Sequence, residues 1–246
     1  MINFSEVSFA STFGKLARFP LQFVPNDVAV PVIQGRLRGK RWLTGSLTHG
    51  CWLGSYESRK QKVFEALITP GSVVFDIGAN VGFYTLLASV LVGGSGRVYA
   101  FEPVQRNLRY LRRHISLNHL NNVTVIDSAV SDVTGRARFS VSGSSAIGSL
   151  SEQGEIEVAT LALDDLDASE YERARSHLKI DVEGAELKVL RGAEVFLRTW
   201  RPSILLATHG PDVHLDCCRF LLGIGYNIRS VDGQPIERTN ELLATP

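Results

Sequence analysis

The run Asp76-Ile77-Gly78-Ala79-Asn80-Val81-Gly82 has the composition of a nucleotide-binding turn. It follows an apolar segment typical of a buried strand and precedes a second apolar segment, residues 83–92, that is typical of a helix. Glycine permits a tight turn and close approach of a ligand, and the start of a helix offers free backbone N–H donors. The run therefore predicts a ligand-binding turn between a strand and a helix.

The first residue of this run restricts the kind of ligand. A dinucleotide fingerprint has glycine there, so that bare backbone meets the doubly charged pyrophosphate. Asp76 would repel phosphates and instead suits a ligand with an ammonium group and no phosphate, such as S-adenosylmethionine (SAM). Glu102 ends the next predicted strand, where a carboxylate can accept hydrogen bonds from both ribose hydroxyls. Together, the two carboxylates favour SAM over NAD or FAD.

Two further side chains are candidate proton acceptors. Asp181 lies at the C-terminal end of a predicted strand, the edge where open α/β sheets bind their ligands. His209 follows a later strand, and an imidazole with an ordinary pKa of about 6.5 takes up a proton at neutral pH. Glu183 and Glu186 fall in the first turn of a predicted helix, where carboxylates also have a structural use against the helix dipole. We favour Asp181, because a strand end is held more rigidly than a loop.

The elements that must position these residues follow from the hydrophobic pattern. From residue 71 onward, short β-branched runs alternate with longer helical periods, which predicts a mostly parallel sheet with helices on both faces. The expected strands cover residues 73–75, 97–101, 123–126, 178–182, 203–207 and 226–230. The expected helices cover residues 83–92, a segment opened by Pro103, 185–199 and 212–222. Two strand-like runs, 137–141 and 156–161, flank a polar stretch and predict an inserted hairpin.

Residues 1–70 have a different pattern and predict an N-terminal β/α extension. Strands are expected over residues 28–33 and 40–43, and a helix over residues 56–68. We expect this extension to act as a lid or acceptor-side cover on a core domain formed by residues 71–246.

Composition and charge exclude several classes of protein. Of the 246 residues, 44% are hydrophobic and 21% are charged, as in an ordinary globular protein with a sizeable core. The net charge of +1 gives no global basic field for nucleic-acid binding. The longest strongly apolar stretch is shorter than the roughly 20 residues that span a bilayer. No secretory signal is recognisable, so we expect a cytoplasmic protein.

The sequence also resembles a known family, the FkbM-type methyltransferases, between about Val28 and Tyr226. The likeness lies in Trp52-Leu53-Gly54-Ser55-Tyr56-Glu57, in residues 74–82, in Ala100-Phe101-Glu102-Pro103 and in Lys179-Ile180-Asp181-Val182-Glu183-Gly184-Ala185-Glu186. The resemblance implies the Rossmann-like α/β fold of class I methyltransferases and SAM as methyl donor. It further implies transfer to a hydroxyl of a small-molecule acceptor, such as a sugar or a natural-product intermediate.

The resemblance also implies roles for individual residues. Asp76, Gly78, Asn80 and Gly82 correspond to the residues at the methionine end of SAM, Glu102 to the residue at the ribose, and Asp127 and Ser128 to residues beside the adenine.

Several alternatives remain open at this point. Asp181 with a nearby carboxylate could hold Mg²⁺ through oxygen ligands and so lower the pKa of the acceptor hydroxyl. A nicotinamide oxidoreductase would need glycine at position 76, and a SAM-fold binding module without catalysis would leave the acceptor side empty. A nucleic-acid methyltransferase would need a basic stripe with stacking aromatic residues, which only residues 36–42 approach.

Overall fold

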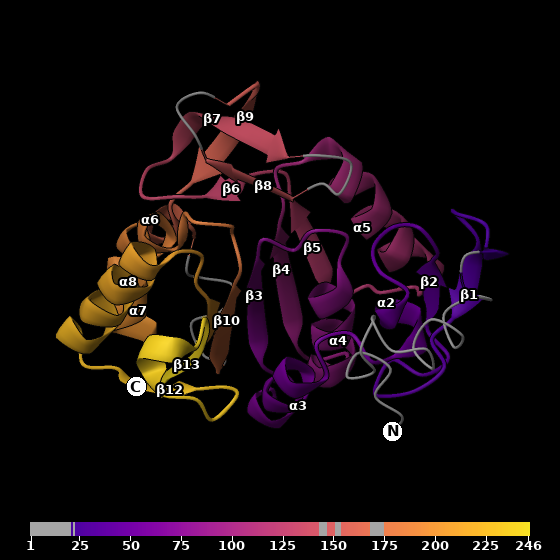
Figure 1. The fold of residues 1–246 in the computed structure, drawn as a ribbon, viewed down its shortest axis with the longest axis horizontal. Coiled ribbons are helices and arrows are strands. Elements are labelled where there is room, and N and C mark those ends of the chain that lie inside the picture. Colours follow the sequence, from indigo (N-terminus) through magenta and orange to yellow (C-terminus); the bar gives the residue numbers. More distant parts are fainter. Residues whose placement is uncertain (1–20, 22, 143–146, 151–153, 168–174) are drawn as a thin grey trace.

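The computed structural model describes residues 21, 23–142, 147–150, 154–167 and 175–246 (Figure 1). Its centre is a seven-stranded sheet in the order β12-β13-β11-β10-β3-β4-β5. The strands are β3 (Val73–Ile77), β4 (Arg97–Phe101), β5 (Val123–Ile126), β10 (Ser176–Ile180), β11 (Ser203–Ala207), β12 (Asn227–Ser230) and β13 (Glu241–Thr245). Neighbouring strands from β11 to β5 are parallel, whereas β13 runs antiparallel to both β11 and β12. The predicted α/β fold with a mostly parallel sheet is confirmed.

The chain order reverses at β3, with β4 and β5 on one side of it and β10 and β11 on the other. Such a reversal leaves a crevice at the carboxyl ends of the two strands that meet there, which is where open α/β sheets bind ligands. The residues that follow β3 and β10 are therefore placed at the same edge.

Helices cover both faces of this sheet (Figure 1). They are α4 (Phe83–Val92), α5 (Gln105–Leu117), α6 (Glu186–Arg191), α7 (Glu194–Trp200) and α8 (Pro211–Gly223). Successive side chains of β3 point to opposite faces, as the period of a strand requires. Phe75 joins the core that contains α6, α7 and α8, while Val74 joins the core that contains α4.

Some predicted boundaries were wrong. The single helix expected over 185–199 is two helices, α6 and α7, because Gly192 packs so tightly that a Cβ there would lie 2.0 Å from the carbonyl oxygen of Ser131. The carboxylate of Asp164 then accepts hydrogen bonds from the backbone N–H groups of Val195 and Phe196, which fixes the start of α7. Pro103 does not open a helix, since α5 begins at Gln105. The strand β10 ends at Ile180, two residues earlier than expected, and β13 was not predicted.

The described residues of the N-terminal extension pack onto the core. The extension contains β1 (Ala29–Pro31), β2 (Arg41–Leu43), α2 (Gly50–Leu53) and α3 (Ser58–Leu67), and β1 pairs antiparallel with β2. Trp42 is fully buried and stacks on the His114 ring of α5, with a centroid separation of 4.0 Å. The His114 Nε2 atom accepts a hydrogen bond of 3.0 Å from the backbone N–H of Leu43. The extension thus shares a core with α4 and α5, and its role as a lid stays a prediction.

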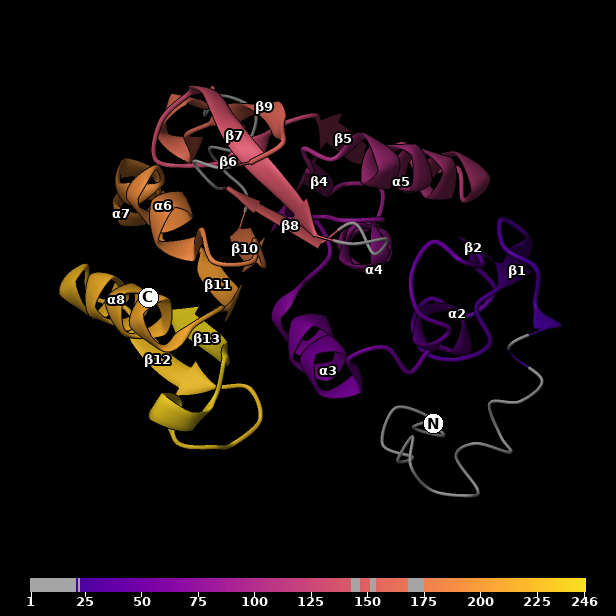
Figure 2. The same ribbon diagram turned by 45° about the horizontal axis from the view of Figure 1, so that its top comes forward.

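A smaller sheet lies at one end of the central sheet (Figure 2). Its strands, in the order β6-β9-β7-β8, are β6 (Ala129–Val130), β7 (Gly135–Ser142), β8 (Ile147–Leu150) and β9 (Ile156–Leu161). The antiparallel pairing of β7 with β9 confirms the predicted insertion, although part of the polar stretch between them lies outside the described residues. Among the described residues, no helix is long and apolar enough to cross a membrane.

Candidate functional site

A cavity of about 310 Å³ opens at the carboxyl ends of four parallel strands. Its lining includes one residue just beyond each strand: Gly78 after β3, Glu102 after β4, Asp181 after β10 and His209 after β11. Its volume falls at the lower end of the range of about 300 to 1,000 Å³ that small-molecule pockets occupy. The candidate residues of the sequence therefore meet around one ligand-sized space.

The turn after β3 depends on its glycines. Gly78 has φ +77°, and a Cβ there would lie 2.0 Å from the carbonyl oxygen of Asp181, so only glycine fits between these two loops. The backbone N–H groups of Gly78 and Ala79 donate hydrogen bonds to the carbonyl of Phe101, which fixes the turn against the end of β4. Gly82, at φ +94°, immediately precedes α4. Gly78 and Asn80 line the cavity, whereas Gly82 shapes the turn behind it.

Glu102 is held in place by three donors. Its carboxylate accepts hydrogen bonds from the backbone N–H groups of Asn80 and Val104, each 2.8 Å long, and from the side-chain amide of Asn107 at 3.2 Å. Only 4% of Glu102 is exposed, and this burial raises its pKa to about 7. Because its hydrogen-bond donors come mainly from backbone, this carboxylate is rigidly placed at the cavity wall.

Asp76 lies elsewhere than expected. It was expected at a cleft, but its side chain is fully buried and does not line the cavity. Its carboxylate accepts a 2.6 Å hydrogen bond from the Thr85 hydroxyl and lies 3.6 Å from the Lys179 ammonium. Burial raises the pKa of Asp76, against the opposing effect of Lys179. Asp76 therefore sits beneath the site, in contact with a lysine that does line the cavity.

Asp127 and Ser128 do not line the cavity either. Asp127 is exposed and pairs with Arg112, and Ser128 is buried with its hydroxyl donating to the carbonyl of Ala129. The wall at this point is formed instead by the next two residues, Ala129 and Val130 of β6. A role of Asp127 or Ser128 beside the adenine stays a prediction.

Two buried lysines that also line the cavity pair with a group of carboxylates, and the sequence analysis had singled out only some of these residues. Lys60 of α3 lies 3.3 Å from Glu57, 3.5 Å from Asp181 and 2.6 Å from Glu241. Lys179 of β10 lies 3.6 Å from the same Asp181 oxygen, Oδ2, and donates a 3.2 Å hydrogen bond to the carbonyl of Gly78. Lys179 and Glu57 stood in blocks that resemble the FkbM family, whereas Lys60 and Glu241 carried no recognisable signal of a shared site.

These lysines decide the charge state of Asp181. Although burial raises its pKa, the ammonium groups of Lys179 and Lys60 hold the pKa of Asp181 below its ordinary value. Both lysines contact Oδ2, so the other oxygen, Oδ1, faces His209. Asp181 is thus an ionised carboxylate with one oxygen directed at the rest of the candidate site.

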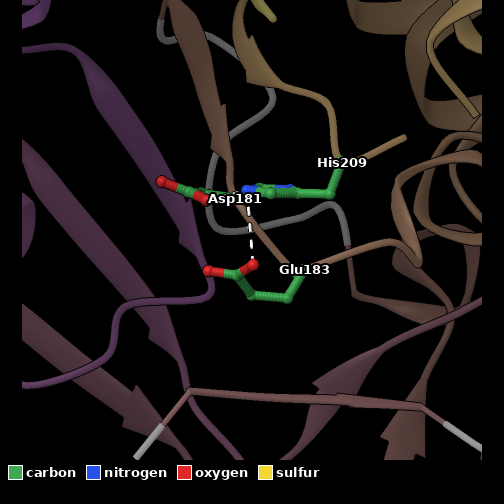
Figure 3. A group of neighbouring side chains, drawn as sticks. All are labelled: Asp181, Glu183 and His209. Carbon is green, nitrogen blue, oxygen red and sulfur yellow. Dashed lines mark ion pairs between the residues drawn. The ribbon is translucent and has the colours of Figure 1, made fainter. Parts of the chain in front are cut away.

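His209 stands between three carboxylates, two of which are drawn with it in Figure 3. Its Nδ1 atom is 2.8 Å from Oε1 of the buried Glu186, and its Nε2 atom lies 3.4 Å from Glu183 and 3.8 Å from Asp181. The hydrogen bond to Glu186 raises the pKa of His209, and the charges of Glu183 and Asp181 add to that effect. One ligand atom each of Asp181, Glu183 and His209 lie within 4.8 Å of one another, so these three residues could hold a cation.

Several known methyltransferases are similar to this chain in sequence. The model of the methyltransferase FkbM domain matches residues 76–228, more than half of the chain. The 31-O-demethyl-FK506 methyltransferase FkbM of Streptomyces tacrolimicus is 31% identical over 161 residues, which cover 52% of this chain and 61% of that protein. A ribosomal protein L11 methyltransferase of Thermoanaerobacter pseudethanolicus is 32% identical over 87 residues, 34% of this chain and 28% of that protein. The matched regions thus span less than two thirds of these relatives.

A solved structure described as a putative rRNA-methylase from Clostridium thermocellum shares the fold. The two structures align with a TM-score of 0.51 at 12% identity, covering 76% of this chain and 92% of the other. The likeness confirms the predicted class I methyltransferase fold.

Proposed function

The chain belongs to the FkbM methyltransferase family, and from this premise we propose that it transfers the methyl group of SAM to a hydroxyl oxygen of a sugar or another small metabolite. The observation that carries the proposal is the single cavity that joins the Gly78 turn and Glu102 to Asp181 and His209. The residues proposed for the methyl donor and those proposed for the acceptor thus line one space, as direct transfer requires.

In this proposal SAM occupies the part of the cavity between the turn and the small sheet. The methionine end lies over Gly78 and Asn80, and the ribose hydroxyls donate to Glu102, whose carboxylate is already oriented by backbone donors. Asp76 acts from below by holding Lys179, and the adenine lies toward Ala129 and Val130. The sulfonium then faces the carboxylates at the other end, which suits its positive charge.

The reaction is an in-line displacement. The acceptor oxygen attacks the methyl carbon, the bond from that carbon to sulfur breaks, and S-adenosylhomocysteine leaves. The hydroxyl proton goes to Asp181 or His209, which both line the acceptor end of the cavity. Most of the rate enhancement comes from alignment of the two reactants.

The charges around the cavity support a small acceptor rather than a nucleic acid. Both lysines that line it, Lys60 and Lys179, are buried and already paired with carboxylates. Five carboxylates line the described cavity beside those two lysines, so a phosphate backbone would meet repulsion there. Relatives named for a ribosomal protein or for rRNA make this distinction worth testing directly.

Two experiments test the proposal. Calorimetry with SAM, S-adenosylhomocysteine and NAD should give micromolar binding of the first two and none of the third; NAD binding without SAM binding would reject it in favour of an oxidoreductase. Transfer of a radiolabelled methyl group should then be measured against polyhydroxylated metabolites, their amine analogues and RNA. Label in RNA or on nitrogen, with none on oxygen, would reject the assigned acceptor, and no transfer to any acceptor would favour a non-catalytic binding module.

A further inference from the structure

The three residues drawn in Figure 3 have a geometry that the proton-transfer role alone does not explain. We propose that Asp181, Glu183 and His209 bind a divalent first-row transition-metal ion, and that Glu186 orients His209 for this purpose. The site lies at the acceptor end of the cavity, so its use in methyl transfer rests on the proposed function, whereas its ability to bind metal does not.

The two ring nitrogens of His209 lie at different distances from the neighbouring carboxylates. The Nδ1 atom lies 2.8 Å from Glu186, the length of a charge-assisted hydrogen bond. The Nε2 atom lies 3.4 Å from Glu183 and 3.8 Å from Asp181, beyond the usual length of such bonds. Ligand atoms that each lie about 2.1 Å from a shared ion are separated by about 3 to 4.2 Å, depending on the angle between them. The Nε2 distances fit that separation.

A buried glutamate, Glu186, lies behind His209. It is fully buried, its Oε1 atom is directed at the His209 ring, and its Oε2 atom has no hydrogen-bond partner among the described residues. A carboxylate behind a histidine keeps the proton on the nitrogen that faces it and leaves the lone pair on the other nitrogen, as is usual for metal ligands. The Nε2 lone pair of His209 is then available to an ion bound beside it, where oxygens of Asp181 and Glu183 lie within 4.8 Å of Nε2 and of each other.

The surrounding charge favours a cation at that point. Five carboxylates and two lysines line the described cavity, and each of these lysines already contacts Asp181 on its far oxygen, Oδ2. The carboxylate of Glu183 forms an ion pair with no lysine among the described residues, so the oxygens of Asp181 and Glu183 beside His209 lie where the cavity keeps an excess of negative charge. A dication would balance it, and their position at the cavity wall leaves further coordination positions for water or the acceptor.

The donor set also selects the class of metal. Mg²⁺ prefers oxygen ligands alone, whereas an imidazole nitrogen with two carboxylates suits ions such as Fe²⁺, Co²⁺ or Zn²⁺. When bound, such an ion would lower the pKa of an acceptor hydroxyl, whose proton would leave to water. In that state Asp181 and His209 serve as ligands and not as proton acceptors.

Direct titration with Co²⁺ tests the site without an acceptor. The full chain, without an affinity tag, is treated with EDTA, dialysed and saturated with S-adenosylhomocysteine, and Co²⁺ binding is followed by visible absorption and calorimetry. We expect saturation at one Co²⁺ per chain, displacement by Zn²⁺, and no displacement by Mg²⁺ in about 100-fold excess, as the ligand preferences require. The described cysteines are buried, which limits competing thiolate sites.

Variants connect that binding to the named residues. His209→Ala and Glu183→Gln should each abolish the one-to-one binding, and Glu186→Gln should weaken it by about 10- to 100-fold, as loss of an orienting partner does. Glu194→Gln, which alters a half-exposed glutamate of α7 paired with Arg198, is the matched control and should bind Co²⁺ like the parent. Failure of the parent to bind Co²⁺, or binding that survives Glu183→Gln, overturns the proposal.

Measurements on the same samples distinguish a failure of the metal site from a failure of the proposed function. Binding of S-adenosylhomocysteine is measured by calorimetry in each variant before metal is added, which also shows that the fold is intact. If the cofactor product binds and Co²⁺ does not, the metal site is rejected while the methyltransferase proposal stands. If neither binds, both are rejected.

Discussion

At the Glu102 end of the cavity the contacts are made by backbone, whereas at the Asp181 end they are made by charged side chains. Glu102 takes two of its hydrogen bonds from N–H groups of the neighbouring turns. Asp181 is held by lysines from α3 and β10, and one of these lysines also pairs with Glu241 of β13. The first end is built from a short span of sequence and the second from segments distant in the chain.

This difference indicates how sensitive each part of the cavity is to substitution. A backbone-built site tolerates side-chain changes around it, because its donors are fixed by the turn itself. A site built from buried charges depends on every partner, because removing one leaves another charge buried without compensation.

Asp76→Ala should mainly destabilise the fold. The variant removes a fully buried carboxylate from beside the buried ammonium of Lys179, which keeps Asp181 as a partner, so the cost is at most the roughly 3 to 5 kcal/mol of breaking a buried pair. Chemical denaturation measures the loss, and Thr85→Val, which removes only the hydroxyl that donates to Asp76, is a milder control. An Asp76→Ala protein as stable as the parent but poor in SAM binding would restore the expectation of a direct ligand contact.

Asp181→Asn should reduce turnover at least about a hundredfold with SAM affinity nearly unchanged, the lower end expected when a general base is lost. Single-turnover kinetics with an identified acceptor give the rate, and calorimetry gives the affinity. Sensitivity of the parent enzyme to EDTA distinguishes a ligand role of Asp181 from a base role. Near-full turnover in Asp181→Asn, with loss in His209→Ala, would transfer the base role to His209.

Glu102→Ala should weaken SAM binding by about 1.5 to 3 kcal/mol, the range for hydrogen bonds to a charged group. The fold should persist, since the N–H groups of Asn80 and Val104 lie at the cavity wall, where water can accept their hydrogen bonds. Calorimetry measures the change, and unaltered affinity would show that the ribose lies elsewhere.

SAM binding should depend on pH through the ionisation of Glu102. Its pKa of about 7 in the free protein means that Glu102 is protonated at lower pH, and a protonated carboxyl accepts ribose hydrogen bonds less well. Above pH 7 the affinity should be flat, and below it the dissociation constant should rise by up to about tenfold per pH unit. Glu102→Gln, which cannot ionise, should bind more weakly but without this slope. A parent curve as flat as that of the variant would exclude Glu102 as the linked group.

Asp127→Ala should have the smallest effect, a change in SAM affinity below about threefold, because its exposed pair with Arg112 lies outside the cavity and such pairs contribute at most about 1 kcal/mol. Calorimetry with the variant is sufficient. A tenfold loss would instead support the position beside the adenine that the family resemblance implies.

Local patterns in the sequence were sufficient to predict the α/β fold, a tight turn before α4 and the position of Glu102 after a strand, although Asp76 and Ile77 belong to β3 and the turn covers only residues 78–82. Each depends on hydrophobic periodicity or on residue types that are adjacent in the chain, and both can be recognised from the sequence alone. The resemblance to the FkbM family rested on the same local blocks and is confirmed by the family match. The roles assigned to individual site residues stay predictions.

Four features follow from tertiary packing: Asp76 is buried, Lys60 contacts Asp181, β13 brings Glu241 to Lys60, and the helix expected after β10 breaks at Gly192. Each of these outcomes depends on which distant segments pack together. The hydrophobic pattern of one segment does not show which other segment it packs against. The charge state of Asp181 is the clearest case, because one of the two ammonium groups that hold it ionised belongs to Lys60, which no pattern in the sequence marks as part of the site.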